Sequence, residues 1–250
     1  MSEEEGECTC PNCCPDGEVA IYSLPLRHFE RFHRHAVEHD PPRAFPGSNN
    51  CVLATVDDDG WPSARCVSLY AHSDSKGFEF CTSELSPKGA DLAASPVAAL
   101  TFLWPASSTQ ARIVGSVVRQ DKDAVAAHFE GAAHSSQAYF VATGNGGPFA
   151  QSSVLTNVEE WKDHVETIDA QEEPYTLPDH WVSYALIPHT IEFLTLVSPG
   201  SRTRYIHLDR CRQSGPAPPL RSALVDLDGD DLTEGTSDVG HGWVEQHLAM

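Results

Sequence analysis

Hydrophobic and polar residues alternate along several short stretches of the first half of the chain, as in antiparallel strands with one buried face. Residues 51–56 and 61–70 flank an Asp-Asp-Asp-Gly turn, which is a strong hairpin signal. Residues 77–82, 97–104 and 109–119 continue the pattern. We therefore predict five antiparallel strands between residues 51 and 119.

Helical patterns surround and follow these strands. Residues 25–39 place Leu26, Phe29, Phe32 and Val37 among charged residues, which predicts an amphipathic helix. Within residues 83–95, Ser86 followed by Pro87 predicts an N-cap and first turn. Two further helices are expected at 121–130 and 157–168, separated by a stretch rich in Ser, Gly and Asn at 135–153.

The hydrophobic pattern in the last third of the chain predicts three strands that form a meander and close the fold. These are residues 181–187 and 190–197, joined by Pro188-His189, and residues 204–208. Residues 211–242 are rich in Pro, Gly and Asp and are interpreted as a long loop or insertion. Short antiparallel strands with inserted helices favour a mainly β (α+β) barrel of Greek-key type with peripheral helices. Neither GxGxxG nor GxxxxGK[ST] is present, so the two commonest nucleotide loops are absent.

Composition and charge narrow the function. The net charge of −20 opposes binding to nucleic acid or an anionic membrane surface, so any phosphate must be held by a few local cations. No run is apolar enough to cross a bilayer, and the acidic start MSEEEGEC lacks the features of a secretory signal. We expect a cytoplasmic protein with a mobile tail at 1–20 and one domain at 21–250.

Cysteine and histidine residues raise the question of a metal. Cys51, Cys66 and Cys81 lie in strand-like runs and are interpreted as small buried hydrophobic residues. In the helix at 25–39, His35 and His39 have a spacing that can bind metal, but no zinc motif accompanies them, so packed or solvated histidines are favoured. A second metal candidate is the N-terminal cluster of Cys8, Cys10, Cys13 and Cys14. The alternative is that these thiols belong to a reactive tail that binds no metal.

The order of several weak motifs is more specific than any one of them. CVLATVDDDGWPSARCVSLY, GFEFCTSELSPKGADLAASPVAALTFLWP, TQARIVGSVVR, AQSS, HWVSYALIPHTIEF and a terminal WVEQHLA follow one another at characteristic spacings. This string resembles the pyridoxine/pyridoxamine 5′-phosphate oxidases, which are FMN-binding split barrels, and the related phenazine-biosynthesis oxidases. The resemblance runs from about residue 51 to 204 and resumes in the last eight residues.

The resemblance implies a homodimer with FMN at the subunit interface. Arg65, Thr82 and Lys88 would hold the phosphate and ribityl chain, Gln110 and Arg204 would lie beside the flavin ring, and the partner subunit would contribute Gln151 and Ser152. Pro87 and Leu194 depart from the family pattern, losing a basic residue and a tryptophan. The full set implied to bind cofactor is Arg65, Cys66, Val67, Cys81, Thr82, Lys88, Gln110, Gln151, Ser152 and Arg204.

The substrate positions differ from those of vitamin B6 enzymes. Where the family has Lys, Tyr, Arg, Ser, Arg and His, this chain has Tyr70, His128, Ala132, Ser136, Gly200 and Arg202. Loss of Lys and Arg removes charge-assisted contacts to a substrate phosphate. The candidates that remain on the substrate side are Tyr70, His128, Ser136 and Arg202, with drifted filler as the alternative for His128.

The sequence therefore predicts an FMN-dependent oxidase that moves a hydride equivalent from a small, non-phosphorylated metabolite to flavin, with O2 as acceptor giving H2O2. Three alternatives stay open. They are a pyridoxine/pyridoxamine 5′-phosphate oxidase, a flavin reductase or flavin-binding module without an organic substrate, and a split barrel that binds heme or a deazaflavin.

Overall fold

The structure is a computed structural model and describes residues 23–40, 47–144, 149–171, 174–197, 200–213 and 236–249. The N-terminal cysteine cluster and residues 214–235 therefore lie outside the described residues. The helices are α1 Leu24–His39, α2 Pro87–Ala94, α3 Lys122–Gly131, α4 His134–Ala142, α5 Val158–Asp169 and α6 Leu208–Gln213. The strands are β1 Asn50–Val56, β2 Pro62–Ser73, β3 Gly77–Ser83, β4 Val97–Trp104, β5 Thr109–Arg119, β6 Trp181–Thr195, β7 Ser201–His207, β8 Thr236–Gly240 and β9 Trp243–His247.

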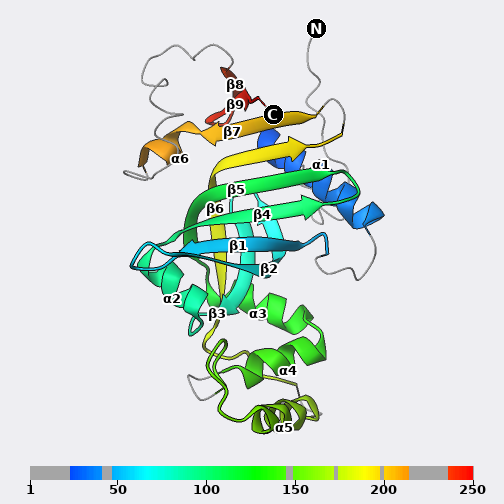
Figure 1. Ribbon diagram of the computed structural model, residues 1–250, viewed down its shortest axis with the longest axis vertical. Helices are drawn as coiled ribbons and strands as arrows, with labels where there is room; N and C mark the ends of the chain where they lie inside the picture. Colours follow the sequence, from blue (N-terminus) through cyan, green and yellow to red (C-terminus); the bar gives the residue numbers. More distant parts are fainter. Residues whose placement is uncertain are drawn as a thin grey trace.

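The strands form one antiparallel sheet that closes on itself. Their order is β3-β2-β1-β4-β5-β6-β7-β9-β8, and an additional β3–β6 pairing closes a barrel of β1 to β6. Strands β7, β9 and β8 extend the sheet beyond the barrel, while α3, α4 and α5 lie at the opposite end of the molecule (Figure 1). The predicted split barrel with peripheral helices is confirmed.

The long strand β6 differs from the prediction. Pro188-His189 does not join two strands but lies inside a single strand, Trp181–Thr195. The pairing shifts from Val114↔Thr190 to Gly115↔Pro188, which leaves His189 as an extra residue and makes a β-bulge. Proline is tolerated at such a bulge because its missing N–H leaves no ladder bond unmade.

Helix α1 forms because Leu26, Phe29 and Phe32 share one face, and that face packs on the barrel interior. Val37, expected on the same face, is instead 57% exposed. The Phe29 ring is fully buried and makes edge contacts with Phe78, Phe102 and Trp104 at 4.9–5.3 Å between centroids. The predicted helix is thus confirmed. Its exposed His35 and His39 rings stack on each other with centroids 4.2 Å apart.

Several local expectations are wrong. Part of the stretch at 135–153 is helix α4, and both described ends of 211–242 are regular, since residues to Gln213 belong to α6 and Thr236–Gly240 form β8. Cys66 is exposed rather than buried, because it lies on the outer face of β2 opposite Val52. Within the described residues, no helix is both long and apolar enough to cross a membrane.

Candidate active site

The N-terminus of α2 and the end of β3 place a lysine in a buried polar pocket. Ser86 caps α2 by accepting a hydrogen bond from Gly89 N, and Lys88 Nζ donates to Ser86 Oγ at 3.2 Å. Lys88 is only 9% exposed, and no described carboxylate forms an ion pair with it. Burial and the nearby Arg65 charge lower the pKa of Lys88 to about 8. A buried ammonium at a helix N-terminus is suited to an anion.

Arg65 reaches the same pocket from β2. Its guanidinium donates to Thr55 Oγ1 at 2.6 Å and to Ser63 Oγ at 2.8 Å, and it lies 3.5 Å from Asp91 Oδ2. Thr55 in turn donates to Asp91 at 2.5 Å. These contacts fix the guanidinium plane. The positive charges of Arg65 and Lys88 together exceed the negative charge of Asp91, so the pocket has a net positive charge.

Gln151 joins this pocket within one chain. Its Oε1 accepts from Lys88 Nζ at 2.8 Å and from Thr82 Oγ1 at 3.5 Å. The resemblance implied that the partner subunit supplies this residue, whereas here it contacts its own chain. Ser152 follows with φ of +68°, a left-handed conformation that turns the backbone sharply after Gln151.

Two of the substrate-side candidates meet next to β3. The Tyr70 and His128 rings stack with centroids 4.4 Å apart. The Tyr70 hydroxyl donates to Glu79 Oε2 at 2.8 Å and lies 2.7 Å from Ser183 Oγ. Burial lowers the pKa of His128 and raises that of Tyr70, so both are neutral at pH 7.

Three further predicted residues are Ser136, Cys81 and Val67. Ser136 lies in the first turn of α4, a helix held to the end of α3 by Gln137 Nε2, which donates to Phe129 O at 2.7 Å. Cys81 packs beside Val125 and Phe129, and its burial raises the thiol pKa to about 12. Val67, on the inner side of β2, packs against the core.

A second polar group lies on the outer face of β5, β6 and β7. The buried Glu192 carboxylate accepts from Arg202 Nε at 2.9 Å and Arg204 Nε at 3.0 Å, and pairs with Arg112 at 3.0 Å. Burial alone would raise the pKa of Glu192, but these arginines lower it below its usual value. Three guanidinium groups around one carboxylate leave a positive surface suited to an anionic or electron-rich ligand.

Strand register places the other ring-side candidate on this surface. Gln110 is opposite Leu194, which is opposite Arg202, and Arg112, Glu192 and Arg204 form the adjoining row. Opposite residues of antiparallel strands point to the same face. Gln110, Arg202 and Arg204 therefore form one group, which we call the arginine half-site.

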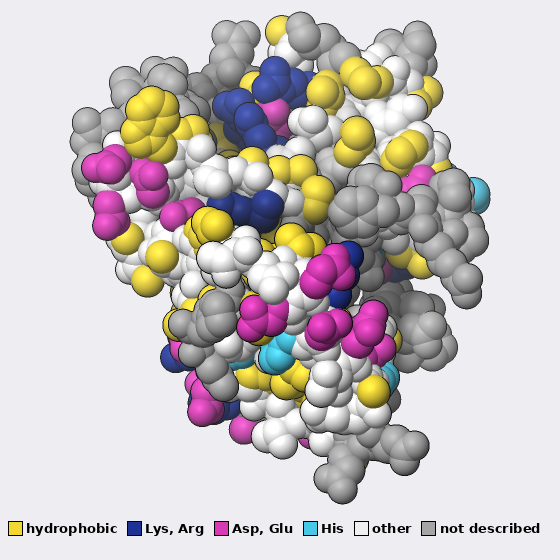
Figure 2. Space-filling view, turned by 60° about the horizontal axis from the view of Figure 1, so that its bottom comes forward, with side chains coloured by type: hydrophobic (Ala, Val, Ile, Leu, Met, Phe, Trp, Pro, Cys, Tyr) yellow, Lys and Arg dark blue, Asp and Glu magenta, His cyan; other side chains and the backbone are white. Residues whose placement is uncertain are grey.

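The candidates thus fall into two half-sites. One, which we call the phosphate half-site because its cations suit an anion, contains Arg65, Thr82, Lys88 and Gln151, with Tyr70 and His128 nearby on β2 and α3. Thr82 is paired with Val182 and Arg204 with Glu192, ten residues further along β6. That is on the order of 30 Å along the strand at about 3.3 Å per residue. Figure 2 shows Lys and Arg side chains in separate groups on one face, with hydrophobic side chains between them.

Sequence reasoning missed the carboxylates that organise both half-sites. Asp91 orients Arg65, Glu79 holds Tyr70, and Glu192 holds the arginines. Glu79 alternates with Phe78 and Phe80 in β3, yet it is only 4% exposed. For Glu192, the signal that could have revealed its role was its cross-strand position beside two arginines.

Comparison with known proteins gives a consistent result. A family model described as pyridoxamine 5′-phosphate oxidase matches residues 42–172. A pyridoxine/pyridoxamine 5′-phosphate oxidase of Acaryochloris marina is 35% identical over 178 residues, covering 70% of this chain and 76% of that protein. A relative with the same description from Myxococcus xanthus is 34% identical over 195 residues, covering 76% and 88%.

Two solved structures show the same fold. PhzG from Burkholderia lata, in complex with tetrahydrophenazine-1-carboxylic acid, has a TM-score of 0.69 at 22% identity and covers 98% of both chains. A pyridoxamine 5′-phosphate oxidase-related, FMN-binding protein from Nostoc punctiforme has a TM-score of 0.59 at 18% identity and covers 74% of this chain and 93% of its own.

Proposed function

Because the chain belongs to the pyridoxamine 5′-phosphate oxidase family, we propose that it is an FMN-dependent oxidase of a small, non-phosphorylated metabolite. The observation that carries the proposal is the pair of half-sites, one built for a phosphate and one for an electron-rich ring or carboxylate. When bound, FMN supplies the acceptor for a hydride equivalent from the substrate, and O2 then takes these electrons to give H2O2.

The phosphate half-site fits the flavin phosphate. Lys88 is buried without a carboxylate ion pair among the described residues, and Arg65 is pre-oriented by Thr55 and Asp91. Thr82 adds a hydroxyl, and Ser86 places the N-terminus of α2 beside the lysine. Gln151 Oε1 would yield its place on Lys88 to a phosphate oxygen, which makes the stronger, charge-assisted hydrogen bond.

Completion of the site requires a second copy of the chain. The phosphate half-site and the arginine half-site lie toward opposite ends of β6, too far apart for one flavin nucleotide to span along the strand. The outer face of β1, β4 and β5 between them exposes Val52, Val97, Leu103 and Val118. We propose that this apolar face forms a homodimer interface, which brings the arginine half-site of one chain to the phosphate half-site of the other.

The substrate-side groups argue against a phosphorylated substrate. Glu79 is buried beside the Tyr70 hydroxyl, and a carboxylate there repels a phosphate dianion. Ala132 supplies no cation at the end of α3. Arg202, by contrast, keeps its Nη1 group for a substrate carboxylate, because within the described part of the chain Glu192 engages only Nε and Nη2. A carboxylated, partly reduced heterocycle meets these conditions.

The test uses the purified full-length protein. We expect a yellow protein that releases FMN, identified by mass spectrometry of the supernatant after denaturation. H2O2 formation should be fast with a reduced phenazine carboxylic acid and slow with pyridoxamine 5′-phosphate. Absence of flavin after reconstitution with FMN would contradict the proposal, as would release of heme or a deazaflavin. Bleaching by NAD(P)H alone would favour a flavin reductase.

A pyridoxine/pyridoxamine 5′-phosphate oxidase is the second candidate. It is favoured by the relatives with that description, which are 34–36% identical to this chain. In that case the same assay would give rapid turnover of pyridoxamine 5′-phosphate, and the phosphate would be bound by residues other than those at Tyr70 and Ala132.

A further inference from the structure

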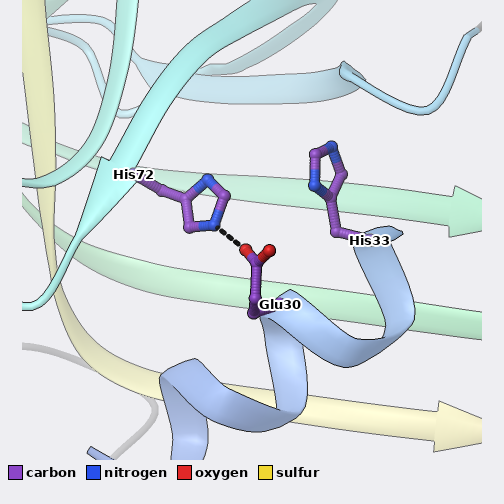
Figure 3. A group of neighbouring side chains, drawn as sticks. All are labelled: Glu30, His33 and His72. Carbon is purple, nitrogen blue, oxygen red and sulfur yellow. Dashed lines mark hydrogen bonds and ion pairs between the residues drawn. The ribbon is translucent and has the colours of Figure 1, made fainter. Parts of the chain in front are cut away.

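A carboxylate and two imidazoles meet where α1 crosses β2, away from both half-sites. Glu30 and His33 come from successive turns of α1, and His72 comes from the far end of β2 (Figure 3). His72 Nε2 and Glu30 Oε2 are 2.6 Å apart, and one ligand atom from each of the three residues lies within 4.8 Å of the others. We propose that these three side chains bind a zinc ion that fastens α1 to the barrel.

The donor set matches the chemistry of zinc. Two neutral imidazoles and one carboxylate are a common three-ligand set for this ion, with a fourth position left for water. In the metal-free structure the His72 Nε2 N–H donates to the Glu30 carboxylate. Zinc would take the place of this proton and would leave one imidazole and one carboxylate as ligands.

A hydrogen bond to Asn49 fixes His33 in the tautomer that a metal ligand needs. His33 Nε2 lies 2.6 Å from Asn49 Oδ1, so it carries the proton and donates to the amide. The other ring nitrogen is then an acceptor, and it faces the His72–Glu30 pair (Figure 3). Such an outer contact is what orients metal-bound histidines in proteins.

The site is close to the required geometry and can be reached from solvent. Tetrahedral zinc with bonds of about 2.0–2.1 Å places its ligand atoms about 3.3 Å apart. The cluster must therefore open slightly between His72 and Glu30 and close on the His33 side. The His72 and Glu30 side chains are 14% and 19% exposed, and Arg34 lies 3.3 Å from the other Glu30 oxygen. Phe29 packs below both imidazoles at 5.0–5.7 Å between centroids, which holds them near their places.

Metal titration of the full-length protein tests this site. Because Cys8, Cys10, Cys13 and Cys14 offer competing thiolates, the titration is also run with all four changed to Ser. We expect that background to keep one zinc equivalent, and its cobalt derivative to show tetrahedral d–d bands without a thiolate charge-transfer band. Zinc should also raise the melting temperature.

Matched variants locate the ion. His33→Gln and His72→Gln should each weaken zinc binding by more than about 100-fold, and Asn49→Ala by roughly 10-fold, because ligands matter more than the groups that orient them. His35→Gln removes an exposed imidazole from the same helix and should leave the affinity unchanged. Should a variant fail to fold, ¹⁵N NMR of the histidine rings in the Cys→Ser background gives the same information. Zinc must shift the ring resonance that is missing from the spectrum of whichever of the two variants, His33→Gln or His72→Gln, does fold.

Two results would overturn the site. One is a Cys→Ser background that binds no zinc at micromolar concentration. The other is zinc binding that His33→Gln and His72→Gln leave unchanged, with no shift of the histidine ring nitrogens. Flavin content and oxidase activity play no part in either result, so failure here is separable from failure of the proposed oxidase.

Discussion

Lys88 combines burial with a positive charge that no described carboxylate neutralises directly. Burial and Arg65 make its protonated form less stable, which lowers its pKa to about 8. A bound phosphate reverses this effect by supplying the missing anion. In the proposed site, binding of FMN and protonation of Lys88 would therefore be coupled.

The coupling predicts how FMN affinity depends on pH. Lys88 is charged below its pKa and neutral above it, so affinity should be highest near pH 7 and fall as pH rises from about 8 to 10. At pH 7, Lys88→Met should lose roughly 10- to 150-fold in affinity, as expected for about 1.5–3 kcal/mol from a charge-assisted hydrogen bond. Quenching of flavin fluorescence measures both effects.

Lys122→Met is the control, because Lys122 is exposed and paired with Asp179 at 3.0 Å. It should keep the affinity and the pH profile of the natural protein. An unchanged pH profile in Lys88→Met would show that another group causes the fall above pH 8.

At the level of residues, the sequence indicated the cations of the site better than the carboxylates. The family resemblance pointed to Arg65, Lys88 and Arg204, and the scarcity of basic residues in so acidic a chain supported that choice. Asp91, Glu79 and Glu192 did not stand out, since their roles depend on contacts between strands distant in the sequence. Glu30, His33 and His72 were hidden for the same reason, because two elements must pack before the three can meet.

The bulge of β6 shows how one glycine sets the course of an element. A Cβ atom added to Gly115 would lie 2.0 Å from Ile187 O, on a backbone that cannot move away without breaking the ladder. Gly115→Ala should therefore lower the free energy of unfolding by roughly 2 kcal/mol or more. Urea denaturation followed by tryptophan fluorescence measures this change.

Gly131→Ala is the matched control, since its Cβ would meet nothing within 4 Å. It should change stability by less than about 0.5 kcal/mol. Equal stability of the two variants would mean that the strands at the bulge separate easily.

Helices and strands could be predicted where one spacing of hydrophobic residues dominated the segment. The alternation of β1 to β5 and the cap at Ser86 gave their positions to within a few residues. The prediction divided β6 at Pro188 because proline usually ends a strand, and only the partner strand reveals the bulge that accommodates it. Helix α4 was missed because the Gly- and Asn-rich residues that follow it dominated the composition of the whole stretch.

At the scale of the molecule, the apolar outer face predicts the oligomeric state. Val52 lies on this face between Cys66 and Thr101 and is 39% exposed. An aspartate there would bury an unpaired charge in the proposed interface. Val52→Asp should convert a dimer into a monomer and weaken FMN binding at least about 10-fold, as seen by light scattering and fluorescence titration.

Val37→Asp is the control, because Val37 is 57% exposed on α1, outside the proposed interface. It should leave the dimer and its FMN content intact. A natural protein that is monomeric while binding one FMN per chain would rule out a shared site.

The path of β6 has a consequence for a symmetric pair of chains. In the proposed dimer each β6 strand would contribute one end to each of the two flavin sites, with the bulge at Pro188-His189 lying between them. The two cofactors of a dimer would then be joined twice by continuous hydrogen-bonded backbone. A shift of β6 on filling the first site would reach the second, so we expect the dimer to load its flavins cooperatively rather than independently.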